Sequence, residues 1–480
     1  MRTQLLWLAI VMLPLSLLGQ ERGKVPLEYL DDSFGTYDEM QKAIWSTNEL
    51  GFLETKSSDI LQEHLQEHGF QVEKAVAGMP TAFVATYGSG YPVIAVLAEY
   101  DALPGMSQDT VPYRRPLEED GNGHACGHNV FGPGAVAGAV AIKKWLASNK
   151  QEGTIKVFGT PAEEGGGGKV YLVRDGYFKD VDVVLDWHPG SRNFVDVANG
   201  FTAAQMIDYT FQGKAAHAAG SPDKGRSALD AVESMNYMVN MLREHIHYAS
   251  RIHYVITDGG KAPNVVPEVA TVSYYIRHPK RDVLEDLVTW VNQAADGAAM
   301  GTQTKVERET IAGFYEKLAN RTLAELVQKN LEIVGGVHYD DRERSFAEGI
   351  VNELGLEPSV LERAVKIQPL ADEKPKTGGG STDVGDVSWN VPTITFGTAA
   401  FIPGSPGHSW QNVAAGGTTI GTKALINAAK VFVRTAIDLY TDPSLIEKAT
   451  EEFESRRGAD FEYVPLVGDR APALNYRQEK

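Results

Sequence analysis

The heptapeptide GHACGHN, residues 123–129, holds the only cysteine of the chain, Cys126, between His124 and His128. A thiolate together with imidazoles suits zinc, and manganese or another divalent ion can accept a similar set. A cysteine nucleophile with a histidine base would use the same residue types, and a glycine-rich turn can bring them together by chance. The heptapeptide by itself therefore leaves a metal site, a thiol active site and coincidence open.

Three short apolar segments are each followed by polar side chains that could bind a metal. They are residues 93–98, before the acidic residues of EYDALP; residues 155–158, before Glu163 and Glu164; and residues 181–185, before Asp186 and His188. Such segments indicate buried strands of an open α/β sheet, which places its sites at the carboxyl ends of its strands. We therefore expect these groups to converge with GHACGHN, and the later stretch PGSPGHSW adds His408.

Length and charge limit the class of protein. A chain of 480 residues with 43% hydrophobic and 22% charged residues predicts a folded protein of about two domains. The formal net charge of −18 disfavours a nucleic-acid or anionic-membrane partner, because both attract positive charge.

The first 20 residues predict an export signal. Arg2 precedes an apolar run from Leu5 to Leu18, which is short for a membrane span and typical of a cleavable signal peptide. An uncleaved anchor is the alternative. One cysteine cannot form an internal disulfide, and a free thiol is a liability in an oxidising compartment. Export therefore favours a metal-bound role for Cys126.

The pattern of elements predicts one domain inserted into another. Residues 21–198 alternate helices and strands, as expected for the first part of an α/β domain. Residues 199–311 follow the order β-α-β-β-α-β of a ferredoxin-like unit. Residues 312–455 resume the first domain, with a strand at TITFGTA and a long last helix over 418–440. The tail, residues 456–480, is predicted to be a peripheral strap.

Several motifs occur in one order along the chain: EYDALP, GHACGHN, TPAEEGGGG, WHPG, GKAAHAAGSPDKGRSALDA, APNVVPE and PGHS. Over residues 30 to 445 the chain resembles the aminoacylase and carboxypeptidase family of two-metal amidohydrolases. The likeness is greatest to the branch of aminobenzoyl-glutamate hydrolase, hippurate hydrolase and the indole-acetyl-amino-acid hydrolases. The resemblance implies a metallopeptidase-like α/β catalytic domain, with a central mixed sheet flanked by helices, and an inserted ferredoxin-like lid and dimerisation domain.

The resemblance also implies two divalent ions per chain, zinc or manganese. The implied metal ligands are Cys126, His128, Glu164, His188 and His408. Glu163 matches the general base of the family, and Asp101 matches an acidic residue behind the metal centre. His124 belongs to the motif but need not bind metal.

Three further residues of the inserted domain match functional positions. His217 matches a histidine that reaches the active site of the partner subunit, which implies a homodimer joined through this domain. Asn264 and Arg277 match a clamp for the substrate carboxylate, and the arginine fork suits a carboxylate. The alternative for Arg277 is a surface strand residue that pairs with an acidic neighbour.

The expected function is that of an exported amidohydrolase that cleaves N-acyl amino acids, with aminobenzoyl-glutamate as the leading substrate. Dipeptides or other acyl amino acids are the alternative substrates. A thiol amidase would leave Glu164, His188 and His408 without a role. A metal-dependent binding protein that performs no catalysis would not need Glu163.

Overall fold

The computed structural model describes residues 24–197, 201–372 and 379–477. The predicted signal peptide and the predicted boundary at 198 lie outside these residues. No helix within the described ranges has the length and apolar character needed to cross a membrane.

The catalytic domain is built on a mixed seven-stranded sheet in the order β1-β2-β4-β3-β5-β11-β6. Its central strands are parallel: β4 (Gly153–Gly159), β3 (Val93–Ala98), β5 (Val183–Gly190) and β11 (Thr393–Ala399). The outer strands β2 (Phe83–Ser89) and β6 (Phe194–Asp196) run antiparallel to the central strands beside them, and the edge strand β1 (Gln71–Lys74) pairs antiparallel with β2. The carboxyl ends of the four parallel strands therefore meet at one edge.

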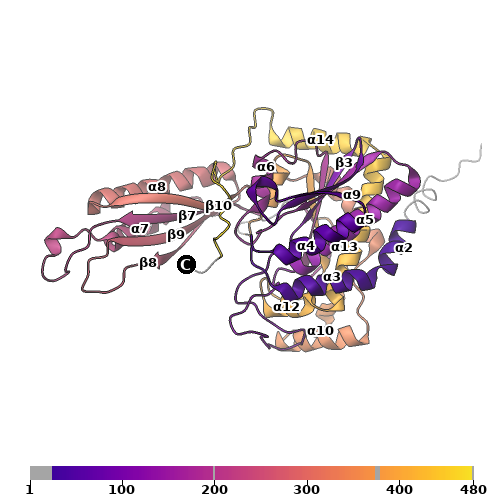
Figure 1. Cartoon of the computed structure of the whole chain (residues 1–480), viewed down its shortest axis with the longest axis horizontal. Coiled ribbons are helices and arrows are strands. Elements are labelled where there is room, and N and C mark those ends of the chain that lie inside the picture. The colour runs from indigo at the N-terminus through magenta and orange to yellow at the C-terminus, as the bar shows by residue number, and fades with distance from the viewer. Residues whose placement is uncertain (1–23, 198–200, 373–378, 478–480) are drawn as a thin grey trace, which may run out of the picture.

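Helices cover both faces of this sheet (Figure 1). One face carries α2 (Lys24–Asp32), α3 (Phe34–Thr47), α4 (Thr55–Glu67), α5 (His128–Asn149), α9 (Arg321–Val334) and α13 (Thr419–Thr441). The other face carries α6 (Gly168–Arg174) and α11 (Val384–Ser388). Along β3, Ile94 and Val96 enter the first core whereas Ala95 and Leu97 enter the second. A strand buried on both faces has no polar side to alternate with, hence its continuous apolar run.

Three more helices belong to the second half of the sequence: α10 (Asp341–Glu353), α12 (Trp410–Gly416) and α14 (Ser444–Arg457). The predicted helix over 418–440 is α13, but it is not the last helix, because α14 follows it. After α14, residues 458–477 run between the catalytic domain and the inserted unit described below; they form the yellow segment of Figure 1. We call residues 458–477 the strap.

The inserted unit is a separate four-stranded antiparallel sheet in the order β10-β7-β9-β8, here called the lid. Along the chain its elements are β7 (Ala203–Gln212), α7 (Ala228–Leu242), β8 (Arg251–Asp258), β9 (Val269–His278), α8 (Arg281–Thr302) and β10 (Lys305–Phe314). This is the predicted β-α-β-β-α-β order, and α7 and α8 share a core with one face of the sheet. Figure 1 shows the lid beside the catalytic domain. The mixed sheet with its helices and the separate lid sheet confirm the predicted fold.

Three details differ from the sequence predictions. The strand expected over 181–185 continues to Gly190, because it pairs with β11 as far as Ala399; Asp186 and His188 therefore lie within β5 rather than after it. The last lid strand runs past the predicted boundary at 311, since Phe314 still pairs with β7 while its side chain enters the catalytic core. The strap is not peripheral, because it contacts both domains and the candidate site described below.

Candidate metal centre

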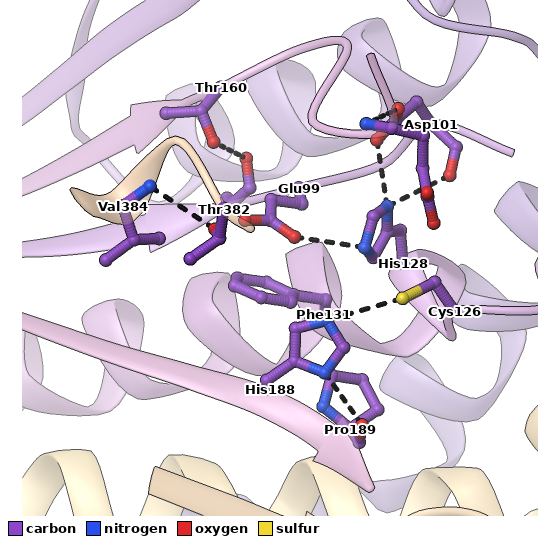
Figure 2. Close-up of polar contacts among 12 residues, drawn as sticks. Glu99, Asp101, Cys126, His128, Phe131, Thr160, His188, Pro189, Thr382 and Val384 are labelled. Carbon is purple, nitrogen blue, oxygen red and sulfur yellow. Dashed lines mark hydrogen bonds and ion pairs between the residues drawn. The ribbon is translucent and has the colours of Figure 1, made fainter. Parts of the chain in front are cut away.

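Three chain segments meet at the carboxyl edge of the parallel strands. The loop after β4 carries Glu163 and Glu164. The segment after β3 carries Asp101, and α5 begins at His128 (Figure 2). The turn before α5 depends on Gly127, whose φ of 80° is left-handed and whose added Cβ would lie 2.7 Å from Phe401 Cζ. This turn places the two side chains that flank Gly127 at the same edge.

Potential ligand atoms gather in three groups within the described residues. Each group has its atoms within 4.8 Å of one another: Cys126, His128 and His188; Cys126, Glu164 and His408; and Glu99, His128 and Glu163. The first two groups contain all five ligands expected from the sequence and share Cys126. The Cys126 sulfur lies 3.5 Å from His188 Nε2, and His408 Nε2 lies 3.4 Å from Glu164 Oε1.

In the first two groups, two buried atoms lack a hydrogen bond and face an ionisable partner instead: His128 Nε2 lies 3.0 Å from Glu99 Oε2, and Glu164 Oε1 lies 3.4 Å from His408 Nε2. Buried polar atoms are normally satisfied, so unsatisfied ones call for an explanation such as a missing ion. A divalent ion would accept electron pairs from both. The donor set of thiolate, imidazole and carboxylate fits zinc.

The two inner histidines are held by groups behind them (Figure 2). His128 Nδ1 lies 2.8 Å from Asp101 Oδ1, and His188 Nδ1 lies 2.8 Å from the Pro189 carbonyl oxygen. Both acceptors favour the tautomer that carries its proton on Nδ1, which leaves the Nε2 lone pair for a metal. Asp101 also accepts the backbone N–H of Glu164 at 2.9 Å, so one carboxylate positions parts of both groups.

Charges inside the centre shift several pKa values. Burial, and then the carboxylates of Glu99 and Glu164, raise the pKa of Glu163 well above its usual value. Burial and the neighbouring Glu164 likewise raise the pKa of the Cys126 thiol. Burial lowers the pKa of His188 to about 4, which keeps its ring neutral. The excess of carboxylates at one locus is an electrostatic cost that cations would offset.

A buried ion network beneath the centre was not predicted from the sequence. Lys169 Nζ lies 2.6 Å from Glu99 Oε1 and 2.7 Å from Asp383 Oδ1, and Glu99 Oε2 lies 3.0 Å from His128 Nε2. Burial favours the neutral form of Glu99, but Lys169 and His128 hold its pKa below its usual range. These residues are far apart in the chain and have no shared local pattern that would reveal the network.

His124 does not join the metal groups. Its Nε2 lies 3.1 Å from the backbone oxygen of Ile44 in α3, and burial lowers its pKa to about 4. His124 thus links the GHACGHN turn to α3, and of the two histidines in this heptapeptide only His128 reaches the centre.

A cavity of about 690 Å³ opens beside the centre, between the catalytic domain and the lid. Glu163, Glu164 and His408 form one wall. Arg277 of β9 faces the same cavity; its Nη1 donates to Ser381 Oγ at 3.2 Å, and its guanidinium carbon lies 4.1 Å from the centroid of the Tyr275 ring. The contacts of Arg277 are thus with a hydroxyl and an aromatic face rather than the acidic strand neighbour considered as its alternative.

His217 and Asn264 lie elsewhere. Both are exposed, in neighbouring loops where β7 ends and β9 begins, at the end of the lid away from the catalytic domain (Figure 1). Ala218 N donates to Asn264 O at 3.1 Å, and His217 Nδ1 accepts the N–H of Gly220 at 2.9 Å. The structure brings these two residues to each other but not to the metal groups of the same chain.

Residues 95–438 match the sequence model of peptidase family M20/M25/M40. One of the subunits of p-aminobenzoyl-glutamate hydrolase from Escherichia coli (strain K12) is 37% identical, over 93% of this chain and 98% of that protein. The Xaa-Arg dipeptidase of Mus musculus is 30% identical, over 89% of this chain and 91% of that protein.

Among solved structures, the Bacillus subtilis YXEP protein, described as a dinuclear metal binding peptidase from the M20 family, shares the fold. The TM-score is 0.56 at 17% identity, and the match covers 86% of this chain and 99% of that one. The ligand groups and the fold agree with the match to the sequence family. This chain therefore belongs to peptidase family M20/M25/M40, and it is a metallo-hydrolase that acts on amide or peptide bonds.

Proposed function

We propose that this protein hydrolyses the amide bond of N-acyl amino acids with two divalent ions held by the five ligands. The observation that carries the proposal is that two ligand groups share Cys126. Cys126, His128 and His188 would hold one ion, and Cys126, Glu164 and His408 would hold the other.

Glu163 is proposed as the general base. Divalent ions bound here would supply a water of lowered pKa and polarise the scissile carbonyl. Glu163 belongs to the third group with Glu99 and His128 and also lines the cavity, so it lies next to both the proposed ligands and the space for a substrate. It would accept the proton of the attacking water and deliver it to the leaving nitrogen. Asp101 acts through His128 and Glu164, which it holds in place, rather than on the substrate.

The raised pKa of Cys126 disfavours a thiol amidase. A cysteine nucleophile needs a thiolate, and burial without a cation favours the thiol instead. Metal binding removes this cost because a coordinated thiol is deprotonated. Inactivation by a chelator, with full recovery on adding zinc, supports the metal mechanism; full activity in metal-free protein would contradict it.

The lid cavity supports an amino-acid leaving group. Arg277, Ser381 and Glu163 line the same cavity, and Arg277 donates to Ser381 Oγ. The planar guanidinium of Arg277 would bind the carboxylate of a substrate in this cavity. Aminobenzoyl-glutamate is the proposed substrate, because the 37% identical relative is named for its hydrolysis. Dipeptides are the second candidate, because the 30% identical relative is named a dipeptidase.

A substrate panel decides between these classes. Aminobenzoyl-glutamate, hippurate, an indole-acetyl amino acid and an Xaa-Arg dipeptide should be compared by kcat/KM, each with added zinc and added manganese. We expect the highest value for aminobenzoyl-glutamate. A highest value for the dipeptide would assign the chain to the second class, and binding without turnover of any member would contradict a hydrolase.

The position of His217 supports an assembly of two chains through the lid. His217 is exposed in the loop after β7, at the end of the lid opposite the strand ends that join the catalytic domain, so we expect it to act on a site of another chain. The edge strand β8 also exposes Tyr254, Val255 and Ile256, which a second lid would cover. We propose a homodimer; since the related hydrolase is named as having more than one kind of subunit, pairing with a different chain is the alternative outcome of a mass measurement.

Export through residues 1–20 is a separate proposal, supported by the apolar run after Arg2. Fusion of this segment to a reporter enzyme that is active only after export should yield activity. The mass of the mature protein then distinguishes cleavage from an uncleaved anchor, and an inactive reporter would contradict export.

A further inference from the structure

The strap is anchored along its length to both domains. On the catalytic side, the ring of Phe461 lies 4.9 Å from that of Trp389, and Tyr463 Oη donates to Asp386 Oδ1 at 2.8 Å. On the lid side, Gln205 Nε2 of β7 donates to the backbone oxygen of Leu466 at 2.9 Å. Contacts of this number and kind fix the path of the strap at the junction of lid and catalytic domain.

The strap then reaches the cavity. Arg470 pairs with Glu309 of β10 at 2.8 Å, while its backbone oxygen accepts Arg174 Nη1 of α6 at 2.6 Å. Beyond it, Tyr476 and Arg477 line the substrate cavity beside Glu163 and Glu164. None of these strap residues falls within residues 95–438, the part that matches the family as a whole.

The end of the strap packs on the loop that carries the two glutamates. Arg477 Nη2 donates to the backbone oxygen of Glu164 at 2.8 Å, and the Tyr476 ring stands edge-on to Phe52 at 5.8 Å. The fit is close: an added Cβ on Gly51 would lie 2.3 Å from Tyr476 Oη, and one on Gly165 would lie 3.3 Å from Tyr476 Cε2.

The backbone of this loop has several residues with positive φ. Ala162 has a φ of 59°, and Gly165 and Gly167 have φ values of 145° and 69°, so several residues adopt conformations that glycine-rich segments leave readily. Glu164 is held at its N–H by Asp101 and at its carbonyl by Arg477. A hydrogen bond from a charged donor is stronger than a neutral one. Arg477 and Asp101 together therefore hold the backbone of Glu164 from both sides.

We propose that Arg477 is a positioning residue of the metal centre: through the Glu164 carbonyl it holds Glu163 and Glu164 in place for base catalysis and metal binding. This inference rests on the proposed roles of these two glutamates. The strap is thereby a structural part of the active site rather than a covering of the domain surface.

The test compares Arg477→Met, which keeps the packing of the stem but removes the donors, with Arg477→Lys, which restores one charged donor. Val464→Ala, at a strap side chain that is 63% exposed, is the control. Zinc affinity is measured by competition with a chelator, and the absorption spectrum of the cobalt(II)-substituted protein reports ligand geometry; neither measurement requires a substrate.

We expect Arg477→Met to fold, to lose about tenfold to a hundredfold in zinc affinity and kcat, and to change the cobalt spectrum, with KM little altered. Arg477→Lys should recover part of each, and Val464→Ala should match the wild type. Wild-type zinc affinity and spectrum in Arg477→Met would overturn the proposal, and so would loss of folding, which would assign Arg477 a structural role. A wild type that binds zinc but hydrolyses no N-acyl amino acid would contradict the proposed function, and the metal measurements would still decide the role of Arg477.

Discussion

The metal centre and the His217 loop are both marked by histidines in the sequence, yet their surroundings differ. At the centre, His128 and His188 are each fixed on Nδ1 by an acceptor and face other ligand atoms with Nε2. In the lid, His217 is exposed, and its Nδ1 accepts only from nearby backbone groups of its own loop, including Gly220.

The two regions differ in whether a single chain is sufficient for their function. The centre has its ligands, the acceptors behind them and a cavity within a single subunit. The His217 loop has a defined conformation but no target among the described residues of its own chain. We therefore expect large effects at the centre that a partner cannot repair, and effects at His217 that a partner can.

Metal removal should have the largest effect. Dialysis against a chelator should abolish hydrolysis, and the purified protein should contain close to two divalent ions per chain, because two ligand groups share Cys126. Metal analysis together with activity on readdition of zinc measures this. Full activity in rigorously metal-free protein would remove the chemical basis of the centre.

The next largest effects are expected at the two adjacent glutamates, whose variants should differ in turnover and in metal content. Glu163→Gln should retain metal but lose turnover by a factor of about 10³ or more, as expected for loss of a base. Glu164→Gln should instead lower metal occupancy, because the Glu164 carboxylate belongs to the second ligand group. Metal content and kcat of the two variants provide the measurement, and equal metal loss in both would contradict the division of roles.

His217→Ala should cost less. We expect His217 to donate a hydrogen bond to the developing oxyanion in the partner's site. Loss of this donor should lower kcat about a hundredfold, or about 3 kcal/mol, with metal content and assembly unchanged. The measurement is kcat beside metal analysis and mass in solution.

Mixing His217→Ala with Glu163→Gln sharpens this result. A mixed dimer has one site with an intact Glu163 and a His217 from its partner, so random pairing should restore about a quarter of wild-type activity. Exchange of subunits without any recovery would place His217 outside the partner's reaction.

The smallest effect is expected at Arg277. Arg277→Lys keeps the charge but loses the fork, so KM should rise about tenfold with kcat nearly unchanged. Arg308→Lys, on the lid strand β10 and paired with Asp296, is the matched control. A change in kcat alone would argue against a carboxylate clamp.

Much of the fold could be predicted because its signals are local. The continuous apolar run of β3 and the β-α-β-β-α-β order of the lid follow from hydrophobic periodicity, which the chain carries whatever its surroundings. The end of β5 could not be predicted, because its last residues are strand only through pairing with β11.

The sequence by itself determined the kinds of ligand, since thiol, imidazole and carboxylate chemistry belongs to the residues and their order matches a family. Only the tertiary structure decided that two ligand groups share Cys126, that Lys169 lies between Glu99 and Asp383, and that Arg477 reaches the Glu164 carbonyl. The Cys126–His188 and Glu164–Arg477 contacts, for example, join residues 62 and 313 positions apart. Local pattern carries no information at such separations; the distances follow from how strands, loops and strap pack together.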